Sequence, residues 1–269
     1  MDTIGIMHHT NKENFYLGYP MRHFLLVTLL LLISLSVKAT SCDTVTISGY
    51  ANWPPYSFQK NGQLVGAGVD IASKIFEQLD IPVQTQVIEN PAHLYALLAQ
   101  GKIDVLVATF DTPAWQQAAI LVQPGYFEDV IAVAVAKDKV FPFERWYDLM
   151  GRTGITVDSI PLGTRFTDFA KQHLIINTKP DATSAFTEVG QFEADYWVGS
   201  GELLRSYLVQ HNASAQFQIL PNLVGPEKVY LAFSKHSPCQ IYIPFAERKL
   251  NNLIDSKMVE QLLERYAIE

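Results

Sequence analysis

Aromatic side chains follow two stretches of this chain that have the pattern of buried strands. The segment ANWPPYSF places Trp53, Tyr56 and Phe58 directly after the alternating stretch DTVTIS. The segment TFDTPAW places Phe110 and Trp115 at the end of the apolar run IDVLV. Aromatic faces attract amines and quaternary ammonium groups and stack on flat rings. If Trp53, Phe110 and Trp115 surround one pocket, they favour a cationic or ring-bearing ligand.

The elements that would position these segments alternate between strand and helix. Val45 and Ile47 share one face of a strand, and GVDIASKIFEQLD has its apolar residues at helical spacing. IPVQTQV reads as a second strand, Pro91 opens a second helix that ends near Gly101, and IDVLVATF is a third, fully apolar strand. This order predicts a parallel α/β unit. In such sheets ligands bind beyond the carboxyl ends of the strands, which is where both aromatic segments stand.

A second series of similar elements follows the apolar stretch DVIAVAVAK. No cluster of glycine and proline forms a flexible linker between the two series, and no repeat is visible. We therefore expect two halves joined by extended, strand-like segments, which commonly act as a hinge.

The beginning of the chain resembles a secretory signal. Met21 and Arg22 precede the apolar run HFLLVTLLLLISLSV, and Val37-Lys38-Ala39 provides small residues for cleavage. The alternative is a membrane anchor, but the run is shorter than the roughly 20 apolar residues that span a bilayer. We expect export and cleavage, with residues 1–39 as an N-terminal extension and signal peptide that starts at Met21.

Cysteine count and charge narrow the class further. Cys42 and Cys239 are the only two cysteines, and an even count in an exported protein favours a disulfide. The alternative is lipidation of Cys42, for which Ala39-Thr40-Ser41-Cys42 is a poor signal. The net charge of −7 argues against nucleic-acid binding. The histidines show no metal-ligand spacing, so we expect neither a metal site nor a cofactor.

Seven short motifs occur in the order and spacing of a known family. They are PPYSF with GQLVGAGVDIASKI, LLAQGKIDVLVA, TP before Trp115, YDLMGRTGITV, Gly163-Thr164, EADYWV and VYLAFSK. Together they resemble the periplasmic solute-binding proteins of the amino-acid-binding type, over nearly the whole chain after the signal. The resemblance implies an α/β, two-lobed type II periplasmic binding fold, in which two hinge strands join mainly parallel sheets flanked by helices. Lobe 1 would be 40–130 plus 226–269, and lobe 2 would be 131–225.

The resemblance also implies a binding cleft and the roles of several residues. Trp53 would be the aromatic platform for the ligand, while Tyr56 and Phe58 pack beneath the loop. Family members usually read TPER where this chain reads TPAW from Thr112 to Trp115, and an aspartate stands where this chain has Ser200. The arginine would pair with a carboxylate and the aspartate with an ammonium group. Without both anchors, a free α-amino acid held in the usual way is not expected.

Other residues could replace the two anchors. Thr164 and Arg165 begin a lobe 2 helix, whose N-terminus attracts anions. Arg165 would be favoured there if an acid of the ligand or of lobe 1 lies opposite, and otherwise it would turn to solvent and pair with Asp168. Glu202 or Asp111 could bind an ammonium group, or either could be a solvated carboxylate. Two aromatic residues are candidates for the same pocket or for the core: Tyr126 and Trp197.

The resemblance allows three functions. The leading one is capture of a solute for an ABC-type importer, and the second is a sensor that reports occupancy to a membrane receptor. We expect a monomer in either case. The third is an enzyme that dehydrates cyclic acids, which would need an acid, a base and an intact carboxylate clamp. We see no such set, so we do not expect an enzyme. The resemblance further places Cys42 and Cys239 side by side, at the start of the first strand and the far end of VYLAFSK.

Overall fold

A computed structural model describes residues 41–157 and 160–267 of the chain. The predicted signal peptide lies outside these residues. Residues 41–269 form one compact unit, in which a ten-stranded sheet has the strand order β10-β9-β11-β8-β13-β6-β1-β5. Two short strands pair at its sides, β12 with β8 and β7 with β13.

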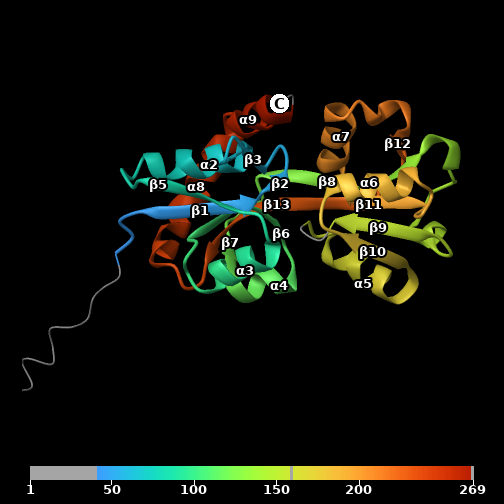
Figure 1. Cartoon of the computed structure of the whole chain (residues 1–269). Coiled ribbons are helices and arrows are strands. Elements are labelled where there is room, and N and C mark those ends of the chain that lie inside the picture. The colour runs from blue at the N-terminus through green and yellow to red at the C-terminus, as the bar shows by residue number, and fades with distance from the viewer. Residues whose placement is uncertain (1–40, 158–159, 268–269) are drawn as a thin grey trace, which may run out of the picture. The chain divides into compact units, whose positions relative to one another are not determined.

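The first half of the sheet is parallel, as the strand and helix alternation predicted. Strand β1 pairs in parallel with β5 and with β6, and β13 closes this half as an antiparallel neighbour of β6. Helices α2, α8 and α9 pack against one another on one side of this half, and α3 and α4 lie on the other (Figure 1). The elements are β1 (Val45–Tyr50), α2 (Ala67–Glu77), β5 (Val83–Ile88), α3 (Pro91–Ala99), β6 (Val105–Phe110), α4 (Pro113–Ala118), β7 (Ala119–Leu121), α8 (Ile243–Asp255) and α9 (Met258–Ala267).

The second half repeats this plan. Strand β9 pairs in parallel with β10 and β11, and β8 closes this half as an antiparallel neighbour of β11. Helices α5 and α6 both pack on β10, α6 also packs on β9 and β11, and α7 packs on β8 (Figure 1). The elements are β9 (Thr153–Val157), α5 (Thr164–His173), β10 (Ile175–Lys179), α6 (Ala182–Gly190), β11 (Tyr196–Ser200), α7 (Gly201–Gln210) and β12 (Phe217–Ile219), with 3-10 turns η1 (Lys137–Lys139), η2 (Trp146–Leu149), η3 (Ala213–Ala215) and η4 (Pro238–Tyr242).

Two long strands connect the halves. Strands β8 (Phe127–Ala136) and β13 (Gly225–Ser234) pair with each other at one end and with different partners at the other. They are the extended connections expected from the lack of a glycine and proline linker. The exchange of partners occurs near Asp129 and Glu227, which lie directly opposite each other in the register.

The aromatic segment after β1 is not only a loop. Asn52–Trp53 (β2), Ser57–Lys60 (β3) and Gln63–Val65 (β4) form a separate three-stranded antiparallel sheet. Asn61 and Gly62 both have positive φ and close the β3–β4 hairpin. Asn-Gly is the strongest short signal for such a hairpin, so this sheet was readable from the sequence.

A disulfide joins the two cysteines, as predicted. The Cα atoms of Cys42 and Cys239 lie 4.9 Å apart, and the bridge links residues that are 197 positions apart in the chain. It ties the segment before β1 to the turn after β13. None of the helices in the described part of the chain combines the length and apolar composition needed to cross a bilayer.

Candidate functional site

Trp53 lies where the two halves of the sheet meet. Its side chain is fully buried, with the rings of Tyr50, Tyr56 and Phe110 packed edge-on around it at centroid distances of 4.9 to 5.5 Å. The indole Nε1–H donates a hydrogen bond of 3.0 Å to Ser200 Oγ. Trp53 follows β1 and Ser200 ends β11, so this bond joins the first half to the second.

Ser200 connects Trp53 to a carboxylate. Its hydroxyl caps α7 by accepting a 3.2 Å bond from Leu203 N–H, and it donates a short hydrogen bond to Asp129 Oδ2. The serine thus stands where the family pattern has an aspartate, and a carboxylate reaches the same place from the neighbouring strand.

Asp129 is the residue of this network that the sequence analysis missed. It lies at the start of β8, 1% exposed, and its Oδ1 accepts bonds from Val130 N–H (2.8 Å) and Glu202 N–H (3.4 Å). Burial is the main cause that raises its pKa from 3.8 to about 6; the Ser200 hydrogen bond opposes this rise and the charge of Glu202 adds to it. The available signal was a lone acid in the apolar run DVIAVAVAK, because buried acids without a stated partner often mark functional sites.

The backbone N–H of Glu202 donates to Asp129, but the Glu202 carboxylate forms an ion pair with another residue. Glu202 lies in the first turn of α7, and its carboxylate forms a short ion pair with Arg205, one turn further along the helix. Of the two predicted substitutes for the missing ammonium anchor, Glu202 therefore has a cation of its own.

Asp111 and Thr164 form a second contact between the halves. Thr164 Oγ1, at the start of α5, donates a 3.4 Å hydrogen bond to the backbone carbonyl of Asp111, which follows β6. The Asp111 side chain accepts from Gln116 Nε2 at 2.6 Å, and Thr112 caps α4 by accepting from Trp115 N–H at 3.4 Å. Asp111 and Thr164 are therefore hydrogen-bonded across the boundary between the halves, whereas Thr112 caps helix α4 in its own half.

An acid that the sequence analysis did not name, Glu227, lies beside the start of α5. A Cβ added to Gly163 would lie 1.8 Å from Glu227 Oε1, so the Glu227 carboxylate fills the space beside the start of α5. The pKa of Glu227 is raised by burial, lowered by the charge of Arg165 and raised by that of Asp111. The Arg165 guanidinium also lies 6.0 Å from the ring centre of Trp146. Gly163, with φ 76° and ψ 150°, adopts a conformation that is essentially confined to glycine.

The remaining aromatic candidates are buried in the same hydrophobic core as Trp53 and Phe110. Trp115 is 6% exposed and packs on Tyr50 and Tyr95, with ring centroids 6.3 and 5.3 Å away. Tyr126 is buried and donates to the carbonyl of Val107 at 3.0 Å. Trp197 is fully buried against Phe186. The rings of Trp53 and Phe110 contact each other directly. Trp115 is linked to Trp53 through Tyr50, whose ring contacts both.

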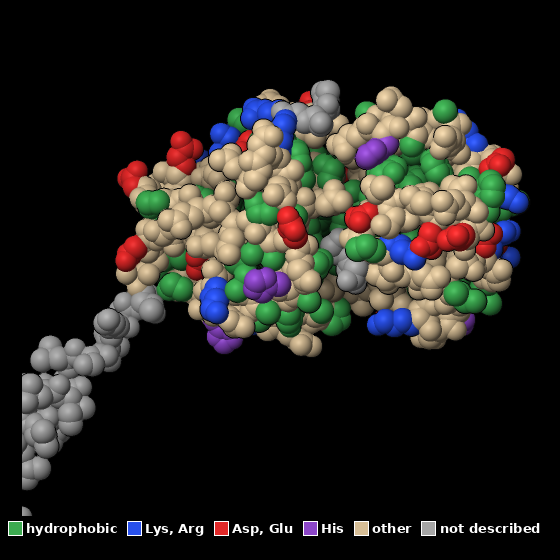
Figure 2. Space-filling view, viewed as in Figure 1, with side chains coloured by type: hydrophobic (Ala, Val, Ile, Leu, Met, Phe, Trp, Pro, Cys, Tyr) green, Lys and Arg blue, Asp and Glu red, His purple; other side chains and the backbone are tan. Residues whose placement is uncertain are grey.

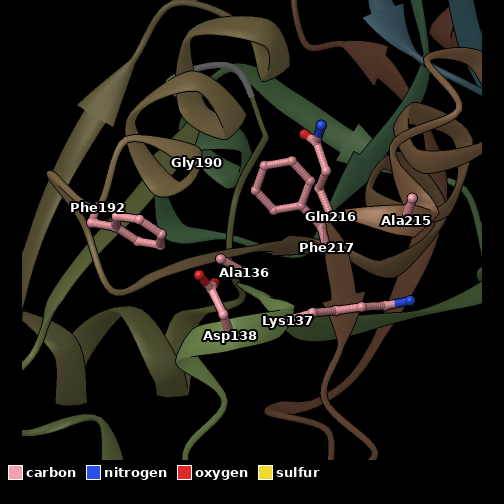
Figure 3. Close-up of a pocket in the computed structure, with 8 residues that line it drawn as sticks. All are labelled: Ala136, Lys137, Asp138, Gly190, Phe192, Ala215, Gln216 and Phe217. Carbon is pink, nitrogen blue, oxygen red and sulfur yellow. The ribbon is translucent and has the colours of Figure 1, made fainter.

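Two further surface features lie elsewhere on the second half. A cavity of about 280 Å³ is lined by residues of β8, η1, the α6 end and the β12 region, and Figure 3 shows the Phe192 and Phe217 rings on it. Its lining shares no residue with the predicted site. On the face in Figure 2, carboxylate side chains lie on both sides of the boundary between the halves, and Lys and Arg side chains are scattered.

This architecture, two α/β halves joined by two crossing strands with contacts between them, defines a two-lobed binding protein. The family described as bacterial extracellular solute-binding proteins, family 3, matches residues 45–267. The chain belongs to this family, and it is therefore a solute-binding protein. This confirms the predicted family and fold.

Solved structures support the fold. A mutant of ArgBP from T. maritima is 22% identical, with a TM-score of 0.70 over 84% of this chain and 96% of that chain. A histidine kinase sensor domain with similarity to periplasmic binding proteins is 16% identical, with a TM-score of 0.71 over 83% and 95%. The amino acid ABC transporter substrate-binding protein AbpA from Streptococcus pneumoniae, bound to L-arginine, is 16% identical, with a TM-score of 0.68 over 84% and 97%. A comparison with curated proteins found no match.

Proposed function

We propose that the chain binds a small polar, cationic or ring-bearing solute between its lobes and delivers it, in the periplasm, to an ABC-type importer. Lobe 1 comprises 40–130 with 226–269, and lobe 2 comprises 131–225. A solute that contacts both lobes stabilises the arrangement in which they are close, which the importer can recognise.

The observation that carries this proposal is the buried hydrogen bond from Trp53 to Ser200. It brings an aromatic ring from lobe 1 onto a polar group at the end of a lobe 2 strand, at the carboxyl edge where α/β sheets bind ligands. The contact between Thr164 and Asp111 lies at the same boundary. Delivery to an importer is further supported by the family and by AbpA, an amino acid ABC transporter substrate-binding protein.

A thermal-shift screen over amino acids, amines, polyamines, quaternary ammonium compounds and aromatic acids tests the binding. A solute present at a hundredfold its Kd stabilises the protein by about 2.7 kcal/mol. We expect the shift to be reduced in Trp53→Phe, which keeps a ring but loses the indole N–H. The matched control is Trp146→Phe, whose indole donates to Val224 O instead. A shift that is unchanged in Trp53→Phe would place the binding site elsewhere.

A sensing role is the second candidate, since a histidine kinase sensor domain shares the fold. Such a protein would signal to a membrane receptor in trans. Permease and ATPase genes beside the coding gene would favour import, and a neighbouring receptor gene would favour sensing.

A further inference from the structure

The buried network at the lobe boundary contains a carboxylate without a cation. Asp129 accepts hydrogen bonds from Ser200, Val130 and Glu202, all of which are neutral donors. No ion pair found within residues 41–157 and 160–267 includes Asp129. A buried charge held only by neutral donors is unfavourable unless a cation completes it.

A buried hydroxyl beside this carboxylate also lacks a partner. Tyr56 is fully buried, and its Oη has no hydrogen-bond partner. The Tyr56 ring packs on Trp53, at a centroid distance of 4.9 Å, and on Phe127 of β8, at 5.8 Å. Burial and the charges of Asp129 and Glu202 raise the pKa of its hydroxyl, while the charge of Arg205 lowers it. A phenol oxygen can accept a hydrogen bond from an ammonium group, and the Trp53 ring, which packs on both Tyr56 and Phe110, provides an aromatic group that attracts cations.

The start of helix α5, where a carboxylate of the solute would be expected to bind, already has an acid of the protein beside it. Glu227 lies directly opposite Asp129 across the β8–β13 pair, so both side chains leave the same face of the sheet. Its carboxylate fills the space beside Gly163 at the start of α5, near Arg165. Because the Glu227 carboxylate occupies the space at the positive end of α5, and Asp111 adds a second negative charge nearby, a carboxylate of the solute would be repelled there.

We propose that Asp129, with Tyr56 and Ser200, binds the positively charged nitrogen of the solute, and that this solute is an amine without a carboxylate next to the nitrogen. This inference rests on the proposed function and specifies its substrate class.

Calorimetric titration with pairs of compounds that differ only by the carboxylate tests the inference. The pairs are agmatine and arginine, putrescine and ornithine, cadaverine and lysine, and phenethylamine and phenylalanine. We expect at least one amine to bind at least tenfold more tightly than its amino acid. Asp129→Asn should weaken that amine about 30-fold or more, as loss of one partner of a buried charge pair does. The control is Asp138→Asn, an exposed acid in η1.

Two further variants test the inference through changes in affinity that a folding defect would not produce. Tyr56→Phe removes only the unpartnered hydroxyl and should weaken the amine several-fold without lowering stability. Glu227→Gln removes the internal acid at α5 and should narrow the gap between amine and amino acid.

Three outcomes would overturn the inference: the amino acid binds more tightly in every pair, Asp129→Asn changes amine affinity less than twofold, or none of the four amines binds. If another solute then binds and Trp53→Phe weakens it, the proposed function stands while the inference fails. If no solute in the wider screen binds, both fail.

Discussion

Replacing Asp129 by asparagine should stabilise the solute-free protein. The carboxylate is 1% exposed and accepts hydrogen bonds only from neutral donors. An amide of the same shape keeps an acceptor for these bonds but carries no charge. The wild-type protein therefore retains a buried charge that solute binding uses and folding does not, which is a common trade-off between stability and function.

The size of the effect follows from the pKa of this carboxyl. In the unfolded chain it ionises near 3.8, and burial raises the folded value to about 6. Between these values the folded protein holds a proton that the unfolded chain has lost, so its free energy of unfolding falls as the pH rises. Above pH 6 the full penalty is present, and a shift of about two units corresponds to roughly 3 kcal/mol at most.

Asparagine avoids this penalty, but its side-chain N–H group needs a hydrogen-bond acceptor. The cost of burying this donor reduces the gain in stability by about 1 kcal/mol. We expect Asp129→Asn to gain about 1 to 2 kcal/mol at pH 8, or about 2 to 8 °C in Tm. The gain should shrink as the pH falls below 6 toward 4, because the folded carboxyl becomes protonated first and the unfolded one begins to take up its proton near pH 4.

Thermal and urea unfolding of the solute-free protein from pH 4.5 to pH 8 measure this difference. Asp138→Asn, at an exposed acid, serves as the control and should show no comparable pH-dependent gain. A variant that is less stable than wild type at pH 8, or whose gain is the same at every pH, would refute the assignment of a buried, ionised Asp129.

Two further perturbations test the framework around the site. Cys42→Ser or Cys239→Ser opens a loop of 197 residues and should lower the free energy of unfolding by about 2 to 5 kcal/mol, measured by urea unfolding; a loss below 1 kcal/mol would contradict the role of the bridge. Gly163→Ala should destabilise by about 1 to 3 kcal/mol and displace Glu227, more than Gly151→Ala, where φ is also positive but the added Cβ meets no atom within 4 Å. Equal losses for the two glycines would show that the Glu227 contact is unimportant.

The regular elements could be predicted from local pattern. Apolar spacing located β1, α2, β5, α3 and β6, and Pro91 correctly marked the start of α3. The lack of a flexible linker predicted the crossing strands. The order of short motifs predicted the family, because each motif reports a local turn or packing requirement that one sequence displays directly.

The composition of the site was only partly predictable. Trp53 and Ser200 were named, but Asp129 was not, since its role depends on Ser200, a residue 71 positions away that reaches it only when β8 and β11 pair. Glu227 was missed for the same reason, because its place beside Gly163 depends on how β13 runs past α5.

The sequence by itself determined the strands, the helices, the crossing connections and the aromatic segment near the lobe boundary, because periodicity and turn residues are local properties. Only the tertiary structure decided which charges face one another there. Burial and charge pairing are set by neighbours brought together from distant parts of the chain, so the same acid can be a solvated surface group or a buried partner for a cation.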